Sequence, residues 1–169
     1  EFIPMPEDLK EMPEETGSTF KENAFIKAKY VSEYFEMPAL ADDSGLEVDA
    51  LNGAPGIFSA RYSSLRTDLS NSTKLLRDMK GVEKENRTAR FRCCLLGFHK
   101  GKTICSEGTL EGEVAESFKG DSGFGYDPIF LIPEYGLHLA EMKKEEKNKI
   151  SHRFKAFEVI LKSLPSLFI

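Results

Sequence analysis

The sequence is poor in cysteine, in long apolar runs and in positive charge, and each shortage excludes a class of protein. Its three cysteines, Cys93, Cys94 and Cys105, cannot form a closed set of disulfides, so we expect reduced thiols in a cytoplasmic protein. No apolar run approaches the ~20 residues that a membrane span needs, and we find no signal peptide, so we expect no association with a membrane. The formal net charge of −5 argues against non-specific binding to nucleic acid.

The remaining composition is typical of a globular protein, with 40% hydrophobic and 30% charged residues. At 169 residues the simplest organisation is one domain with a core of its own. Apolar periodicity, N-cap residues and turn signals predict helices at 19–35, 69–80 and 151–164, and strands at 37–41, 46–50, 90–98, 102–116 and 128–132. Strands mixed with flanking helices predict an α/β or α+β fold.

Two adjacent carboxylates, Asp42 and Asp43, follow the apolar run Met37–Ala41. A buried strand that ends in this way brings acidic side chains to the rim of a sheet, where α/β proteins keep their ligand sites. Paired carboxylates there can bind a divalent cation, act as a general base, or do both. The alternative is a turn that ends the strand, because Asp favours turns, as do Ser44 and Gly45, which come next.

The first predicted helix carries a lysine on its apolar side. The apolar stripe consists of Phe20, Ala24, Val31 and Phe35. Lys27 points along this stripe, and either its ammonium group reaches solvent or the cation is held there for a purpose. Asn23, one turn earlier, is expected to form a polar ledge with it. Glu15, ahead of the helix, either complements the helix dipole or supplies a second oxygen ligand for Mg²⁺ beside Asp43.

Two later segments also carry polar residues suited to a ligand. Residues 122–128 place aromatic rings and an acid in a glycine-rich loop, which can stack on a base, although a turn with core aromatics would look the same. In the last helix Ser151 is the expected N-cap, and His152 and Arg153 are cations in the first turn, where the dipole disfavours them. A bound phosphate would explain them, and a cap with solvated charges is the alternative. This helix is expected to bury Phe154, Phe157, Ile160, Leu161 and Leu164.

A series of short segments occurs in one order along nearly the whole chain. They are Glu14–Gly17, Thr19–Ala24 with Lys27–Ala28, Ala41–Leu46, Gly53–Gly56, Ser59–Tyr62, Gly123–Pro128 and Ser151–Arg153. In this order they resemble the inosine/xanthosine triphosphate pyrophosphatase family, the Ham1-like house-cleaning nucleotidases. The resemblance implies an elongated, mixed central sheet flanked by helices, with the active-site cleft between two lobes, and a homodimer. Members begin with a strand and a phosphate-binding loop, so residues 1–169 are expected to be one domain that lacks its amino-terminal strand, loop and helix.

The resemblance also implies an activity and a set of site residues. The activity is the Mg²⁺-dependent hydrolysis of non-canonical purine nucleoside triphosphates (ITP, dITP and XTP) to the monophosphate and pyrophosphate. Asp43 would be the proton acceptor and a metal ligand, Glu15 the second metal ligand, and Lys27 a catalytic contact to the phosphates. The implied substrate contacts are Ser44, Phe124, Gly125, Tyr126, Asp127, Lys147, His152 and Arg153.

Two rival functions are compatible with the same sequence. One is a Maf-like nucleotidase of related fold, which acts on pyrimidine or modified triphosphates. The segments 124–127 and 151–153 favour the purine family over this rival. The other is a catalytically inactive, nucleotide-binding paralogue, and the joint presence of Glu15, Lys27 and Asp43 argues against it.

Overall fold

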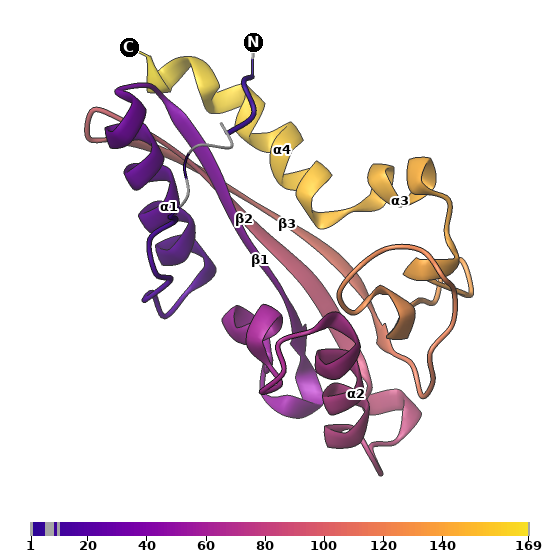
Figure 1. Cartoon of the computed structure of the whole chain (residues 1–169). Helices are drawn as coiled ribbons and strands as arrows, with labels where there is room; N and C mark the ends of the chain where they lie inside the picture. The colour runs from indigo at the N-terminus through magenta and orange to yellow at the C-terminus, as the bar shows by residue number, and fades with distance from the viewer. Residues whose placement is uncertain (1, 6–8, 10, 169) are drawn as a thin grey trace.

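A five-stranded sheet forms the centre of the computed structural model, which describes residues 2–5, 9 and 11–168 (Figure 1). In spatial order its strands are β1 (Ala39–Val48), β2 (Thr88–His99), β3 (Lys102–Val114), β4 (Phe130–Ile132) and β5 (Leu137–His138). The α/β class is confirmed. The resemblance implied a mixed sheet, but all pairings among the described strands are antiparallel. Each strand pairs with its successor in sequence, and short reversals such as the Lys100-Gly101 hairpin can join only antiparallel neighbours.

β1 is one continuous strand of 10 residues, which corrects the expectation of two extended pieces. Its register with β2 runs without a break from Ala39 opposite Phe98 to Val48 opposite Ala89. A long partner strand therefore supplies backbone hydrogen bonds through the polar stretch, and this pairing overrides the turn preference of the local sequence. Asp42 and Asp43 consequently lie in the middle of the strand, neither at a carboxyl-terminal rim nor in a turn.

Helices α1 (Phe20–Phe35) and α4 (His152–Ser163) lie on opposite sides of the long strands (Figure 1). On one face, Phe20, Ala24 and Ala28 of α1 pack against Cys94, Leu96 and Phe98 of β2. On the other face, Ile160 of α4 packs with Ile104 of β3. Because successive side chains of a strand alternate between the two faces, neighbouring residues of β1 face different helices.

α1 begins and ends where the sequence predicts. Thr19 is its N-cap and accepts a hydrogen bond from the Glu22 backbone N–H, and the helix ends at Phe35. The buried stripe includes Phe20 and Ala24 as expected, and also the polar Asn23, which is fully buried. A buried amide must find hydrogen-bond partners, so Asn23 indicates a polar contact with the sheet.

α4 has the expected N-cap, Ser151, and Ile160 is buried as predicted, but most of the predicted apolar face is exposed. Its buried residues are Ala156 and Ile160, whereas the exposed ones include Phe154, Phe157 and Leu161. The reason is Gly108 of β3, which has no side chain. A Cβ atom at this position would lie only 2.1 Å from the His152 carbonyl oxygen, so only glycine allows so close a contact. The helix backbone approaches the strand at this glycine, so the small Ala156 faces the sheet in place of a phenylalanine.

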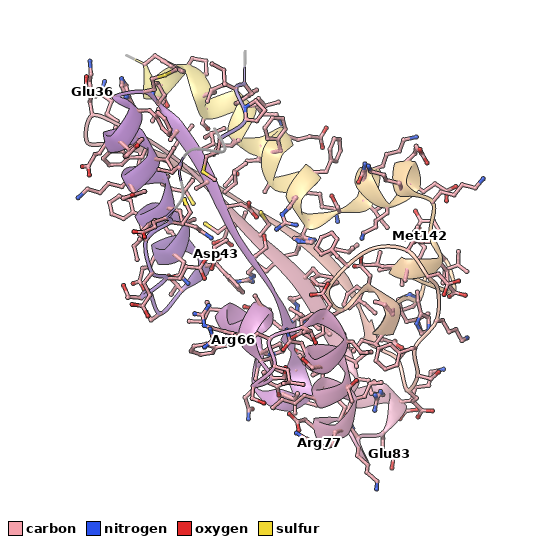
Figure 2. All side chains as sticks on the ribbon, viewed as in Figure 1. Glu36, Asp43, Arg66, Arg77, Glu83 and Met142 are labelled. Carbon is pink, nitrogen blue, oxygen red and sulfur yellow. The ribbon has the colours of Figure 1, made fainter. Side chains whose placement is uncertain are left out.

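The Val48 end of the sheet carries a second group of elements, which includes the short 3₁₀ helix Gly56–Arg61 and α2 (Asp68–Asp78), whereas α3 (Lys144–Ile150) leads into α4 (Figure 1). The largest core cluster lies here, where Leu75 and Met79 are fully buried, as the sequence predicts. The segment expected to be a strand at 128–132 begins instead with a 3₁₀ turn, Asp127–Ile129, before β4. Asp43 lies midway along β1, between the Val48 end of the sheet and α1 (Figure 2).

Among the described residues, no helix is both long enough and apolar enough to cross a membrane.

All three cysteines are free thiols, but only Cys105 is exposed. Burial raises the pKa of Cys93 to about 11, and burial together with the neighbouring Cys105 raises the pKa of Cys94 further.

We expect one thiol to react rapidly with a thiol reagent such as Ellman's reagent in the folded protein, and three to react in denaturant. Cys105→Ser should remove the rapid reaction. Rapid labelling that persists in this variant would contradict the assignment.

Candidate active site

The first group of site residues lies between α1 and β1. The Lys27 ammonium group lies 2.8 Å from Glu15 Oε1 and 2.9 Å from Asp43 Oδ1. The lysine side chain is only 16% exposed, so it is held between two carboxylates and does not extend into solvent. The structure therefore brings together the three residues for which the sequence predicts catalysis and metal binding.

Two further residues hold this group in place. Asn23 donates from Nδ2 to Asp43 Oδ2 at 3.2 Å and accepts at Oδ1 from the Gly17 N–H at 2.8 Å. The buried amide thus joins the loop that carries Glu15 to the strand that carries Asp43. Arg61 donates from Nη1 to Glu15 Oε2 at 3.1 Å. The helical spacing predicts Asn23 near Lys27, as observed, whereas the contact of Arg61 with Glu15 was not predicted, although Arg61 lies in the segment Ser59–Tyr62.

The two carboxylates of this group differ in acidity. Burial raises the pKa of Asp43 above its ordinary value, and the nearby Glu15 charge adds to the increase, although Lys27 opposes it. Burial also acts on Glu15, but hydrogen bonds and charge from Lys27 and Arg61 outweigh it and hold that pKa below its ordinary value. The arrangement gives one carboxylate that stays ionised and one that can exchange a proton nearer neutral pH, as a general base requires.

Glu15 and Asp43 are carboxylates of the kind that hold a divalent cation, but Glu15 Oε1 and Asp43 Oδ1 both contact the Lys27 ammonium group. Mg²⁺ is commonly held by one or two carboxylates, with water and substrate phosphates completing its coordination. Within the part of the chain that the structure describes, no group of three or more His, Cys, Asp or Glu side chains could hold a metal. The donor set fits a metal shared with a phosphorylated ligand.

The second group of site residues surrounds Phe124, in the loop before β4. The Phe124 ring is exposed, with Lys147 Nζ 4.7 Å and Arg153 Cζ 5.9 Å from its centroid. The buried Asp127 accepts a hydrogen bond from the Phe124 N–H at 2.9 Å and forms an ion pair with Lys147. An exposed ring flanked by two cations can bind a flat, electron-rich group such as a nucleobase.

Gly125 and Tyr126 have partners within the protein. Tyr126 is buried in the core and donates from its hydroxyl to the Ser59 carbonyl at 2.7 Å, and burial raises its pKa. The Gly125 N–H donates to Asp68 Oδ2 at 2.7 Å, and its carbonyl accepts from Ser72 Oγ at 3.0 Å. These contacts hold the loop that presents Phe124. Sequence reasoning missed Asp68 and Ser72, because their contacts join segments far apart in the chain.

Asp42 faces away from Asp43, as the alternation along β1 requires. Its Oδ2 accepts from Arg153 Nε at 2.9 Å and from Ser44 Oγ at 2.8 Å. Asp43, by contrast, faces Lys27 on α1. The interpretation of the two neighbours as a pair of carboxylates around one cation is therefore wrong, because they lie on opposite faces of the sheet.

His152 is uncharged near neutral pH. Its ring stacks on Phe91, with the centroids 5.1 Å apart and an interplanar angle of 11°. Burial and the Arg153 charge lower its pKa to about 4. A neutral histidine, together with the Arg153–Asp42 ion pair, reduces the unfavourable charge at the start of α4, so no bound phosphate is needed to explain these residues. Within the described part of the chain, Nδ1 of His152 is buried without a hydrogen-bond partner.

Neither of two shallow pockets contains these residues. One, of about 640 Å³, is lined by residues of α1 and the loop before it, and by Leu96 and Thr103. The other, of about 670 Å³, lies along β3 near Tyr135 and Lys155. The residues of the candidate site lie on both faces of β1, outside these two pockets.

Comparison with known proteins identifies the family of the chain. The Ham1 family model matches residues 2–163. Relatives named dITP/XTP pyrophosphatase include one from Halalkalibacterium halodurans, 51% identical over 153 residues (89% of this chain, 79% of that protein), and one from Nitratidesulfovibrio vulgaris, 48% identical over 163 residues (92% and 79%). The solved Ham1 protein of Staphylococcus aureus has a TM-score of 0.84 at 42% identity and covers 90% of this chain and 80% of its own. A HAM1 structure from Coxiella burnetii has a TM-score of 0.86 at 42% identity (92% and 81%). Because these matches span nearly the whole chain, the chain belongs to the Ham1 family.

Proposed function

We propose that this chain is a Mg²⁺-dependent nucleoside-triphosphate pyrophosphatase that hydrolyses ITP, dITP and XTP to the monophosphate and pyrophosphate. The observation that carries the proposal is the convergence of Glu15, Lys27 and Asp43 on one position. The relatives named dITP/XTP pyrophosphatase support the substrate class. The reaction requires a base for water and positive charge beside the phosphates, and this cluster contains both.

The residues between α1 and β1 would carry out the hydrolysis. Asp43 would take a proton from the attacking water, since its raised pKa makes it a better base than an ordinary aspartate. Glu15 and Asp43 would hold Mg²⁺, which supplies charge neutralisation at the phosphate oxygens. Lys27 would stabilise the negative charge that develops on the phosphoryl group, and Arg61 would keep Glu15 oriented.

The residues around Phe124 would bind the base. Its exposed ring offers a stacking surface, and Lys147 and Arg153 offer donors beside it. Donors favour a base that carries an oxo group as acceptor, so this group favours hypoxanthine and xanthine over adenine. Adenine, which lacks this acceptor, would leave the donors without a partner on the base.

Product analysis tests the proposal. The chain, with any residues that its gene encodes upstream, is incubated with Mg²⁺ and with ITP, XTP, ATP, GTP or dTTP in parallel. Monophosphate and pyrophosphate from ITP and XTP alone are the expected products. Preferential turnover of dTTP would favour the Maf-like alternative. Nucleotide binding without turnover would favour an inactive paralogue, and release of orthophosphate would exclude pyrophosphatase chemistry.

Replacing Lys27 with methionine should lower kcat for ITP by about 10²- to 10³-fold, the usual cost of losing one charge-stabilising donor. The substitution should also move the acid limb of the pH–rate profile to higher pH. Asp43 works in its ionised form, so activity is lost as the pH falls through its pKa. Lys27 lowers that pKa, and its removal therefore raises it.

The matched control for this substitution is Lys29→Met, on the same helix. Lys29 is half exposed and forms a loose pair with Glu33, with its Nζ 3.9 Å from Glu33 Oε1. The control should retain the kcat and the pH profile of the original chain. Steady-state rates between pH 5 and 9 measure both effects. An unchanged rate in Lys27→Met would show that the lysine only fills space beside the carboxylates.

A further inference from the structure

Asp42, like Asp43, is held by hydrogen bonds to neighbouring side chains, but it has no role in the proposed hydrolysis. It lies on the α4 face of β1, where one carboxylate oxygen accepts from both Arg153 Nε and Ser44 Oγ. The Cys93 thiol lies 3.9 Å from the same oxygen. These contacts fix the Asp42 carboxylate against the side chain of Arg153. A charged group held on a rigid strand can orient a flexible partner.

The contact leaves the outer part of the arginine available. Asp42 binds Arg153 through Nε only, and within the described residues neither terminal nitrogen of this guanidinium makes a hydrogen bond. Arginine has five N–H donors in a fixed planar fork, so holding Nε sets the direction of the other four. The guanidinium carbon lies 5.9 Å from the centroid of the Phe124 ring. The free donors therefore lie over the ring that is proposed to bind the base.

Arg153 would lack a fixed orientation without this carboxylate. Its side chain is 50% exposed, and in the described part of the chain Asp42 is the acid with which it pairs. A long exposed side chain loses rotamer entropy when it is fixed. An arginine already fixed by Asp42 avoids most of that cost when the ligand binds.

We propose that Asp42 is a positioning residue that fixes the Arg153 guanidinium beside Phe124, so that its free N–H groups meet an acceptor on the base. The inference rests on the proposed function and deepens it. It assigns different tasks to two adjacent carboxylates, with Asp43 serving the phosphates and Asp42 serving selection of the base. The ligand class is a purine with an oxo acceptor in reach of Arg153.

The expected kinetic effect is on binding and selectivity. Asp42→Asn should raise the KM for ITP about tenfold, which corresponds to about 1.4 kcal/mol, with kcat changed by less than about threefold. The preference for ITP over ATP should fall by a similar factor, because ATP presents no oxo group to Arg153. A role confined to folding would lower the rates for both nucleotides equally.

A double-mutant cycle separates action through Arg153 from other actions. The four proteins are the original chain, Asp42→Asn, Arg153→Met and the double variant. If Asp42 acts through Arg153, Asp42→Asn costs tenfold in kcat/KM in the original chain and nothing once Arg153 is gone. An equal cost in both backgrounds would overturn the inference and place the effect at Asp43 instead.

The matched control is Asp49→Asn, which removes a carboxylate from another arginine pair just beyond the end of β1. Asp49 pairs with Arg90, with its Oδ1 2.8 Å from Arg90 Nη1, and it touches neither group of site residues. The control should retain the KM for ITP and the preference over ATP. A tenfold change in the control would show that loss of a surface carboxylate alone affects the assay, and it would remove the support for Asp42.

A measurement without turnover distinguishes failure of this inference from failure of the proposed function. In ¹⁵N NMR spectra the Nε–H of an arginine held by a carboxylate exchanges slowly and gives a resolved signal. The Arg153 signal, assigned by its loss in Arg153→Met, should be present in the original chain and absent in Asp42→Asn. If the signal persists in Asp42→Asn, the positioning role is wrong, whether or not the chain hydrolyses ITP. If the signal behaves as expected but ITP is not hydrolysed, the proposed function is wrong.

Discussion

Asp43→Asn is expected to lower kcat for ITP by about 10²- to 10⁴-fold, the range for loss of a general base. The substitution keeps the shape of the side chain, but the amide has a single acceptor oxygen, so it can accept from Lys27 or from Asn23 and not from both. It removes the negative charge that takes up the proton of water and that would bind Mg²⁺. Both losses act on the chemical step, so the effect should exceed that of Lys27→Met or Asp42→Asn.

The measurement is single-turnover hydrolysis of ITP at saturating Mg²⁺, with the thermal midpoint of each protein measured alongside. Asp49→Asn again serves as the control, because it removes a carboxylate outside the site. The Asp43→Asn variant should unfold within a few degrees of the original chain. A folded variant that retains more than a tenth of the activity would exclude Asp43 as the base and direct attention to Glu15.

Arg87→Met is expected to reduce the free energy of unfolding by at least about 3 kcal/mol. Arg87 is buried, and no carboxylate pairs with it in the described part of the chain. Its guanidinium donates instead to the carbonyl oxygens of Met79 (3.0 Å), Val82 (3.3 Å), Val114 (2.6 Å) and Ala115 (3.0 Å). Each buried acceptor that loses its donor costs about 1–3 kcal/mol. Since these carbonyls belong to the end of α2 and the end of β3, Arg87 joins the helix to the sheet.

Thermal unfolding measures this effect. For a domain of this size a loss of 3 kcal/mol lowers the midpoint by about 6–12 °C. Arg77→Met is the control, because Arg77 lies on α2 and 73% of its side chain is exposed. This substitution should change the midpoint by less than about 2 °C. At temperatures where the variant is folded, turnover should be close to that of the original chain. A midpoint unchanged in Arg87→Met would show that the carbonyls find water or other donors.

The elements that were predicted well are those set by local signals. α1 begins at the cap Thr19 and α4 at the cap Ser151, because a side-chain oxygen at that position satisfies the first free N–H groups whatever the helix packs against. The hairpin at Lys100-Gly101 has positive φ angles at both residues, 46° and 82°, as a tight antiparallel turn requires. Such signals depend only on residues a few positions apart.

The elements that were predicted wrongly depend on distant partners. The strand end expected at Asp42 and Asp43 lies inside a longer strand, because β2, about fifty residues later, pairs with this segment throughout. The buried face of α4 was misjudged because Gly108 of β3 brings the helix backbone close and selects Ala156 for the interface. Neither partner can be identified from the periodicity of the segment itself.

The candidate site divides in the same way. The sequence by itself determined which residue types are available, including an acid pair, a lysine on an apolar helix face and an exposed ring in a glycine-rich loop, because these depend on composition and local spacing. Only the tertiary structure decided that Asp43 meets Lys27 while Asp42 meets Arg153. The physical reason is that alternation along a strand separates neighbours, whereas packing of α1 and α4 on opposite faces supplies each carboxylate with its own cation.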